Sequence, residues 1–334
     1  MQKIILSRTD SIGDVILTLP MAGVLKEMLP GCRIIFLGRD YTRDIISLSV
    51  HVDEFISWDD ISKIENNAQP EFIKKTEADT IIHVFPKKEI AAIAKKAGIK
   101  NRIGTSGRLY HYFTCNKRVN FSRKRSELHE AQLNLKLLRP LGWRKNLNLS
   151  ELESYYGLTK KPALVKEFSS LIDPSRVNLI LHPKSRGSAR EWGLDNFRQL
   201  IEILDQTKYK IFVTGTEEEG KEFRKHISFN SNCLDVSGRM SLKQLVAFID
   251  QADGLIAAST GPLHIAAALE KVAIGIYPPI KPMHPGRWAP VGPKATFLVL
   301  DKDCSDCRKE GSCHCMAVIK PQKVQQILED HFGK

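Results

Sequence analysis

The chain has 334 residues, of which 42% are hydrophobic and 26% are charged. This length accommodates two ordinary α/β domains, and the composition supports a substantial core, which excludes disorder as the main state and any need for a disulfide framework. The formal net charge of +12 favours anionic partners.

The apolar runs bear on location. The longest, residues 252–277, is interrupted by polar and charged side chains and cannot span a bilayer as a helix. Met1 leads directly into a strand-like run, and no basic region followed by a long apolar stretch and a small-residue cleavage site appears, so a secretory signal is not expected. We therefore expect a cytoplasmic protein, or one attached to a membrane from the cytoplasmic side.

In the first half of the chain, β-branched runs alternate with helical patterns. The strand-like runs lie at residues 4–6, 33–38, 55–58 and 80–85, with a shorter one near Arg102. One helix is predicted from about Asp14 to Met28 and another from Glu127 to Leu141, each ended by a Pro or Gly turn. Strands that alternate with helices predict a parallel sheet.

A strongly basic segment occupies residues 95–145. It contains 14 Lys or Arg residues and two acidic ones, Glu127 and Glu130, so it alone accounts for the net charge of +12. Nucleic acid could explain this charge, but no helix-turn-helix, zinc-finger or ribonucleoprotein signature accompanies it. An anionic membrane surface or a phosphorylated lipid fits equally well, and a solvated face that keeps the protein soluble is the third interpretation.

The alternation of strands and helices resumes in the second half. Strand-like runs lie at residues 177–183, 210–215, 233–236, 254–258 and 272–277, and a final helix is expected from Pro321 to Phe332. We predict an N-terminal domain over residues 1–155, a C-terminal domain over residues 156–319 and a C-terminal helix over residues 320–334. Two doubly wound domains in tandem would leave a cleft at the carboxyl ends of their sheets, where open α/β folds bind ligands.

Four of the seven cysteines are close in sequence, in a C-x2-C-x5-C-x1-C group. They are Cys304, Cys307, Cys313 and Cys315. Their thiolates could complete a tetrahedral zinc site, but this is not the spacing of a standard zinc finger. A structural or redox-inert loop is the preferred interpretation, and no metal or other cofactor is predicted.

The first loop that could carry chemistry is S-R-T-D-S-I-G-D at residues 7–14. It lacks the glycine patterns of dinucleotide-binding and P-loop sites. Asp14 lies at the expected start of a helix, where it could cap free N–H groups, a contribution of about 0.5–2 kcal/mol. Its alternative role is that of a general base facing the cleft.

Two loops in the second half suit an anionic ligand. The loop H-P-K-S-R-G-S-A-R-E-W at residues 182–192 brings Lys184, Arg186 and Arg190 together with Ser185, a set that suits a phosphate ester or a diphosphate. In S-T-G-P-L-H at residues 259–264, glycine and proline predict a helix N-terminus that attracts anions. His264 falls inside that helix, where a buried structural role near the ligand is favoured.

Several motifs in the same order resemble glycosyltransferase family 9, the heptosyltransferases of lipopolysaccharide core assembly. They are S-I-G-D-V-I-L-T-L-P at 11–20, R-I-G at 102–104, H-E-A-Q-L-N-L-K-L-L-R-P-L-G at 129–142, H-P-K-S with R-E-W, S-G-R-M-S-L at 237–242, and S-T-G-P-L-H-I-A-A-A-L at 259–269. The resemblance covers nearly the whole chain. It implies the GT-B arrangement: two Rossmann-like, doubly wound parallel-sheet domains with an interdomain cleft, the acceptor on the first and the nucleotide sugar on the second.

The resemblance also implies roles for individual residues. Asp14 becomes the expected catalytic base. By position, Ser185 and Arg190 match donor-phosphate contacts, and Met240 falls where the backbone of the family meets adenine. Thr260 and Gly261 match the diphosphate-binding helix start, with His264 beside them. Ser259 replaces an Asp of many heptosyltransferases, which leaves the donor sugar open.

The implied reaction is inverting and metal-independent. Heptose would move from ADP-heptose to the Kdo-lipid A inner core of lipopolysaccharide, and Arg123, Lys124 and Arg125 would bind this anionic acceptor. The expected protein is a monomer at the cytoplasmic face of the inner membrane, with no nucleic-acid partner. The alternatives are a family 9 transferase that uses another nucleotide sugar, or a nucleotide-sugar-binding protein without turnover.

Overall fold

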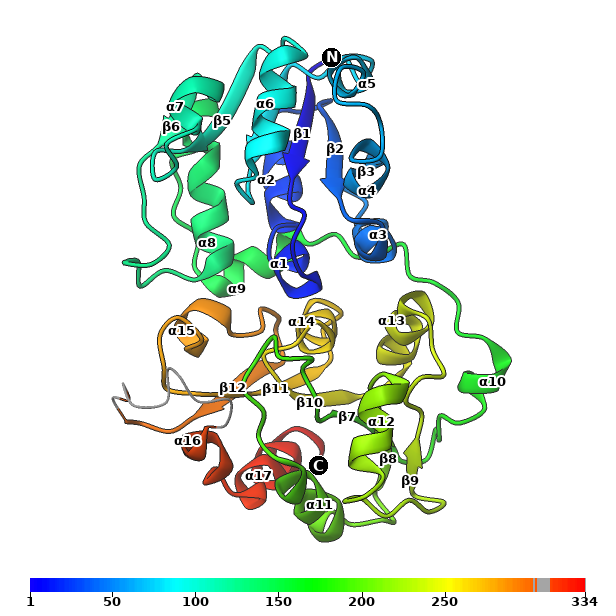
Figure 1. Cartoon of the computed structure of the whole chain (residues 1–334). Coiled ribbons are helices and arrows are strands. Elements are labelled where there is room, and N and C mark those ends of the chain that lie inside the picture. The colour runs from blue at the N-terminus through cyan, green and yellow to red at the C-terminus, as the bar shows by residue number, and fades with distance from the viewer. Residues whose placement is uncertain (303, 305–312, 334) are drawn as a thin grey trace. The chain divides into compact units, whose positions relative to one another are not determined.

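The computed structural model describes residues 1–302, 304 and 313–333. The chain forms two compact units, residues 1–160 (unit 1) and 161–334 (unit 2), each built around one six-stranded sheet (Figure 1). No helix among the described residues is both long and apolar enough to cross a bilayer.

The sheet of unit 1 has the strand order β3-β2-β1-β4-β5-β6, and all its neighbouring strands run parallel. The strands are β1 (Lys3–Ser7), β2 (Arg33–Gly38), β3 (Glu54–Ser57), β4 (Thr80–His83), β5 (Asn101–Thr105) and β6 (Lys117–Val119). In β1, Ile4, Ile5 and Leu6 are fully buried in succession. Such an unbroken apolar run is typical of a parallel strand that is covered by helices on both faces.

The helices of unit 1 are short. They are α1 (Ile12–Ile16), α2 (Pro20–Met28), α3 (Arg43–Ile46), α4 (Trp58–Ile61), α5 (Gln69–Lys74), α6 (Lys88–Lys96), α7 (His111–Thr114), α8 (Glu130–Leu135) and α9 (Leu149–Leu152), with 3-10 turns at Asp40–Thr42, Lys136–Leu141 and Glu153–Tyr155.

The single helix predicted from Asp14 to Met28 was wrong, because two helices occupy this stretch. Pro20 is the first residue of α2 and follows a turn after α1. Proline has no N–H to donate to the carbonyl of Ile16, and its ring crowds that carbonyl, so α1 ends before it. The consequence is a very short α1 whose first turn holds Asp14.

Unit 2 repeats the same plan. Its strand order is β12-β11-β10-β7-β8-β9, with all neighbours parallel. The strands are β7 (Val177–His182), β8 (Tyr209–Val213), β9 (Cys233–Asp235), β10 (Gly254–Ala258), β11 (Val272–Tyr277) and β12 (Ala295–Val299). The helices are α10 (Lys166–Ser169), α11 (Leu194–Ile203), α12 (Glu217–Phe223), α13 (Leu242–Gln251), α14 (Gly261–Ala268), α15 (Pro285–Trp288), α16 (His314–Ala317) and α17 (Pro321–Phe332).

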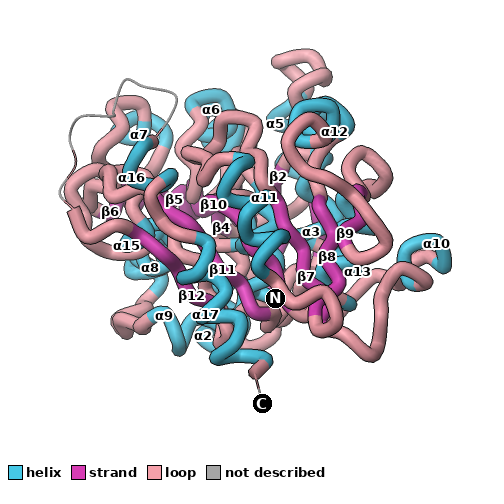
Figure 2. Tube along the Cα trace, turned by 90° about the horizontal axis from the view of Figure 1, so that it is seen from below, coloured by secondary structure: helices cyan, strands magenta, loops and turns pink. Residues whose placement is uncertain are grey.

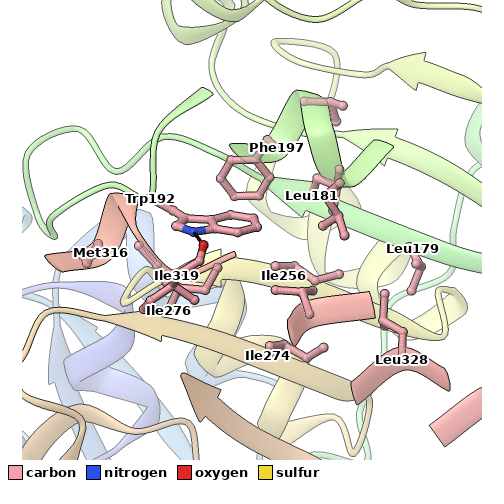
Figure 3. Close-up of a cluster of buried hydrophobic side chains, with 14 of the residues drawn as sticks. Leu179, Leu181, Trp192, Phe197, Ile256, Ile274, Ile276, Met316, Ile319 and Leu328 are labelled. Carbon is pink, nitrogen blue, oxygen red and sulfur yellow. Dashed lines mark hydrogen bonds between the residues drawn. The ribbon is translucent and has the colours of Figure 1, made fainter. Parts of the chain in front are cut away.

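The last helix completes the core of unit 2. In Figures 1 and 2, α17 lies beside α11, against which it packs, and Val324 and Leu328 of α17 are fully buried. Figure 3 shows Leu328 in the same apolar cluster as Ile256 and Ile274 of the sheet.

Both sheets have the strand order 3-2-1-4-5-6 in the numbering of their own unit. This is the doubly wound Rossmann order. It confirms the predicted fold class of two Rossmann-like domains, which is the domain composition of GT-B enzymes.

Candidate functional site

In each unit, the strand order reverses between two central strands, β1 and β4 in unit 1 and β7 and β10 in unit 2. Open α/β sheets bind ligands outside the carboxyl ends of the strands at such a switch point. The loops singled out in the sequence follow β1, β7 and β10. The topology therefore places them at the two switch points.

Arg8, the first residue after β1, is the centre of a buried group of charges. Its guanidinium is only 3% exposed and donates to Asp10 at 2.7 Å, to Glu130 at 3.1 Å and to Asp14. Three carboxylates from two distant parts of the chain thus surround one buried cation. Burial alone would lower the pKa of Arg8, but Asp14, Asp10 and Glu130 together raise it, so this guanidinium remains charged.

Asp14 belongs to this group through side chains. Its carboxylate accepts hydrogen bonds from Arg8 and from the Ser11 hydroxyl. Within the described residues, no backbone N–H donates to it, so its observed contacts are not those of a helix cap. The side chain is 17% exposed. Arg8 and Ser11 therefore orient a carboxylate that still reaches solvent.

Arg123 completes the group from a different loop. Its guanidinium donates to Glu130 at 2.9 Å and to Asn134 at 3.0 Å, and it reaches the carbonyl of Val84 just after β4 at 3.2 Å. Glu130 itself is only 1% exposed. We refer to Arg8, Asp10, Asp14, Arg123 and Glu130 as the Arg8 cluster.

The three predicted acceptor-binding residues therefore lie in two different environments. Arg123 lies in the Arg8 cluster, whereas Lys124 and Arg125 are exposed. An acceptor anion could contact these two exposed cations without competing with buried carboxylates.

Asp10 has a perturbed acidity. Burial raises the pKa of its carboxyl to about 6, partly countered by Arg8 and reinforced by Asp14. The Arg8 cluster therefore contains a group that titrates just below neutral pH.

His83, the last residue of β4, lies opposite Ser7 of β1 at the same switch point. It is fully buried, and neither of its ring nitrogens has a hydrogen-bond partner among the described residues. Its ring centroid lies 5.7 Å from that of His111. Burial lowers the pKa of His83 to about 3, and His111 and Arg102 add to this effect, so the imidazole is neutral.

In unit 2, the loop after β7 is held by its own carboxylate. Glu191 accepts the backbone N–H of Ser185 at 3.0 Å, and the Ser185 hydroxyl lies 3.1 Å from the same carboxylate and 2.9 Å from the carbonyl of Ala189. Lys184 pairs with Glu191 at 2.7 Å and with Glu222 at 2.9 Å. The prediction grouped Lys184 with the phosphate contacts, but the structure places it between two carboxylates.

Trp192 anchors the end of this loop. The side chain is fully buried, its ring packs edge-on against Phe197 at 5.0 Å, and its indole N–H donates to the carbonyl of Ile319 at 2.8 Å (Figure 3). The predicted donor residue Arg190 is half-buried and lies two positions before this anchor. Arg190 is therefore close in sequence to a residue that is fixed in the core of unit 2.

The loop after β10 leads into the N-terminus of α14. Thr260 is the N-cap, and Gly261 is the first helical residue. The Thr260 side chain is 4% exposed, and its hydroxyl has no hydrogen-bond partner among the described residues. A buried hydroxyl without a partner beside free helix N–H groups suits an anionic ligand, because it would gain a hydrogen bond on binding.

The other predicted donor-binding residues do not all lie at the switch point of unit 2. Ser259 hydrogen-bonds to the hydroxyl of Tyr277, and His264 is buried inside α14. Met240 is half-buried and follows the edge strand β9, which β7 and β8 separate from β10. The sheet thus brings the loops at 183–192 and 259–261 together on adjacent strands, and leaves Met240 at its edge.

The cysteine group is partly described. Cys304, Cys313 and Cys315 are buried in the core of unit 2, and Cys307 lies outside the described residues. Burial raises the pKa of the Cys315 thiol, and contact with Cys304 raises it further. Among the residues that the structure describes, no group of three or more His, Cys, Asp or Glu could hold a metal ion.

Arg8 and Glu130 were not among the predicted site residues. Both lay within quoted motifs, S-R-T-D and H-E-A-Q. The sequence signal for Arg8 was a charged residue directly after a buried strand. The signal for Glu130 was a Glu in the first turn of a helix that His129 caps. Their contact joins positions 122 residues apart and becomes visible only in the fold.

Comparison with known proteins identifies the family of the chain. The family model described as "Glycosyltransferase family 9 (heptosyltransferase)" matches residues 71–316. A Haemophilus influenzae protein named only as a glycosyltransferase is 28% identical over 304 residues, which cover 87% of this chain and 86% of that protein. Lipopolysaccharide heptosyltransferase 1 of Salmonella typhimurium is 23% identical, over 84% of this chain and 89% of its own.

A solved structure shares the fold. The ADP-heptose lipopolysaccharide heptosyltransferase II of Escherichia coli superposes with a TM-score of 0.76 at 19% identity, covering 99% of this chain and 98% of that one. The family match extends over most of the chain. The chain therefore belongs to glycosyltransferase family 9, the heptosyltransferase family, as its motifs predicted, and is a glycosyltransferase.

Proposed function

We propose that this glycosyltransferase moves heptose from ADP-heptose to the Kdo-lipid A inner core of lipopolysaccharide, with inversion and without a metal. The observation that carries the proposal is the carboxylate of Asp14, held at the switch point of unit 1 by Arg8 and Ser11 and still partly exposed. Such a group can accept a proton from a bound hydroxyl.

In the proposed mechanism, Asp14 accepts the proton of an acceptor hydroxyl while that oxygen forms a bond to the anomeric carbon. The bond from this carbon to the diphosphate oxygen breaks on the opposite face, so the configuration inverts and ADP leaves. The charge that develops on the diphosphate is stabilised by Arg190, Ser185 and the N-terminus of α14. The unpartnered hydroxyl of Thr260 supports this assignment of the donor phosphates.

The acceptor and the location follow from charge. Lys124 and Arg125 are exposed cations close in sequence to Arg123 of the Arg8 cluster, and they suit a phosphorylated, Kdo-bearing acceptor. We propose that the chain meets this acceptor at the cytoplasmic face of the inner membrane, as a peripheral protein. The monomeric state stays a prediction.

Substitution of Asp14 tests the mechanism. Asp14→Asn keeps the size and a hydrogen-bonding oxygen but cannot take the proton, so turnover should fall about 10²–10⁴-fold while binding of ADP is unchanged. The matched control is Asp10→Asn, which removes the other nearby aspartate that contacts Arg8 and should keep turnover within about tenfold. Products from ADP-heptose and defined truncated cores are measured by mass, and ADP binding by calorimetry. Unimpaired transfer by Asp14→Asn would refute the proposal.

A second candidate is transfer of a different sugar by the same chemistry. Ser259 favours this second candidate, because its hydroxyl, which is hydrogen-bonded to Tyr277, replaces the carboxylate of many heptosyltransferases. A panel of nucleotide sugars offered with the same cores separates the two candidates. ADP-heptose as the preferred donor supports the first, and another preferred donor supports the second. Binding of nucleotide sugar without product from any core would instead support a non-catalytic binding protein.

A further inference from the structure

The surface around α7 exposes large apolar side chains. Leu109 is 78% exposed, Phe113 69% and Tyr112 53%. Among the described residues, the only other large apolar side chain that is more than half exposed is that of the N-terminal Met1. We refer to Arg108, Leu109, Tyr112, Phe113 and Arg118 as the α7 surface.

The α7 surface is rigidly backed. His111, between the exposed residues, is fully buried, and its Nδ1 lies 3.1 Å from the backbone N–H of Thr105. A side chain at Gly104 of β5 would bring its Cβ to 2.6 Å from this nitrogen, so the helix packs closely on the strand. The exposed apolar side chains therefore project from a fixed base rather than from a loose loop.

Positive charge surrounds these apolar side chains. The guanidinium of Arg118 lies 4.6 Å from the ring centroid of Tyr112. Burial lowers the pKa of His111, and the nearby charges of Arg108 and Arg118 lower it further. Residues 90–126 contain ten Lys or Arg and no Asp or Glu. The acidic residue just before this stretch is Glu89. Burial raises the pKa of Tyr110, and the charge of Glu89 contributes to this increase.

This combination distinguishes between two kinds of partner. A stable protein interface needs roughly 800 Å² from each side, far more than three neighbouring side chains supply. A bilayer surface needs much less, because a few inserted apolar side chains act together with the attraction between basic residues and anionic lipids. Aromatic rings with a polar edge, such as Tyr112, also prefer the membrane interface.

We propose that the α7 surface docks the chain on an anionic phospholipid bilayer, with Leu109 and Phe113 inserted between lipids and Arg108 and Arg118 on their phosphates. The inference rests on the proposed membrane-side function only for its biological purpose. Lipid binding is measured without donor or acceptor, and transfer is measured on a water-soluble core oligosaccharide. The two proposals can therefore fail separately.

The test is co-sedimentation of the full chain with vesicles of phosphatidylglycerol and phosphatidylethanolamine, against vesicles of phosphatidylcholine. We expect binding to the anionic vesicles, weakened about tenfold or more both in Leu109→Ser/Phe113→Ser and in Arg108→Glu/Arg118→Glu. Matched controls in unit 2, Val165→Ser and Lys221→Glu/Lys225→Glu, should bind as the unsubstituted chain does. The controls remove an apolar side chain that is 46% exposed and change the same amount of charge.

A second measurement covers the case in which a variant folds poorly. In Phe113→Trp, the added tryptophan fluorescence should be quenched by phosphatidylglycerol with brominated acyl chains. Sedimentation of Leu109→Ser/Phe113→Ser equal to that of the unsubstituted chain would overturn the proposal. An equal loss of vesicle binding in the charge-reversed variant of the α7 surface and in its control, Lys221→Glu/Lys225→Glu, would also overturn it. So would a tryptophan at position 113 whose fluorescence brominated lipid does not quench.

Discussion

At the scale of single residues, the main finding is that one buried arginine organises the carboxylates of unit 1. Arg8 contacts Asp10, Asp14 and Glu130 through three different guanidinium nitrogens, whereas an ammonium would have to reach all three carboxylates from a single nitrogen. The sequence motif indicated Asp14 as a candidate base, but it did not indicate Arg8 as the partner that orients the Asp14 carboxylate. In the mechanism that we propose, Arg8 would act through Asp14, as a positioning residue.

Arg8→Lys tests this role. The substitution keeps the charge but loses the fork of donors, so kcat should fall about 10–100-fold while the KM for the donor changes little. The unfolding free energy should decrease by about 1–3 kcal/mol, because buried Glu130 loses a charged partner. Steady-state kinetics and urea denaturation measure the two effects.

The control for Arg8→Lys is Arg33→Lys, in a half-exposed pair with Glu54 at 3.8 Å. It should leave kcat unchanged, because exposed ion pairs contribute little. If Arg8→Lys changed stability but not kcat, Arg8 would be structural only.

At the scale of elements, the long buried strands were predictable and the short polar ones were not. The run at 33–38 matches β2 in both of its bounds, because Arg33 is followed by five apolar or small residues, which fit a strand buried on both faces. β6 (Lys117–Val119) was missed, since an edge strand pairs on one side and needs no apolar run. The helix predicted from Glu127 begins at Glu130, where His129 and Gln132 form a capping box, and continues as a 3-10 turn that contains Pro140.

The end of β4 gives a prediction about acid stability. The folded pKa of His83 is about 3, below the ordinary value of 6.5, so as pH falls the unfolded chain takes up a proton that the folded chain does not. The stabilisation is therefore complete above the ordinary pKa and is lost as pH decreases. At pH 5 the loss should be about 2 kcal/mol.

His83→Leu should remove this loss, because leucine does not titrate and leaves no buried nitrogen without a partner. Urea denaturation at pH 7.5 and pH 5 measures the difference between this variant and the unsubstituted chain. His226→Leu, at an exposed position in unit 2, is the matched control and should keep the full pH dependence. An equal pH dependence in His83→Leu would contradict the assignment.

At the scale of the whole molecule, the proposal divides the work between two units of the same topology. The doubly wound parallel sheets were predicted from the alternation of strands and helices and from the family motifs, whereas the order 3-2-1-4-5-6 comes from the structure. Long-range contacts within each unit, such as Arg8 with Glu130 or Trp192 with Ile319, required the fold. Sequence spacing carries no information about partners more than 100 residues away.

This division predicts separable effects on donor and acceptor. Thr260→Val in unit 2 removes the proposed phosphate contact and should weaken ADP binding about tenfold, with no change in the KM for the acceptor. Lys124→Glu/Arg125→Glu in unit 1 should raise the KM for the acceptor about tenfold, more at low salt, with no change in ADP binding.

Lys63→Glu/Lys74→Glu is the charge-matched control in unit 1, at side chains that are 75% and 65% exposed, and it should alter neither quantity. Calorimetry with ADP and steady-state kinetics at two salt concentrations measure the three variants. A loss of ADP binding in Lys124→Glu/Arg125→Glu would contradict the separation.

The Arg8 cluster has a consequence for the direction of proton flow. When all its members are ionised, two guanidinium groups face three carboxylates, so the cluster is one proton short of neutrality. In a poorly hydrated environment, uptake of one proton removes this imbalance, and uptake of a second creates the opposite one. In the mechanism that we propose, this single proton is the one that Asp14 takes from the acceptor hydroxyl and returns to solvent before the next turnover.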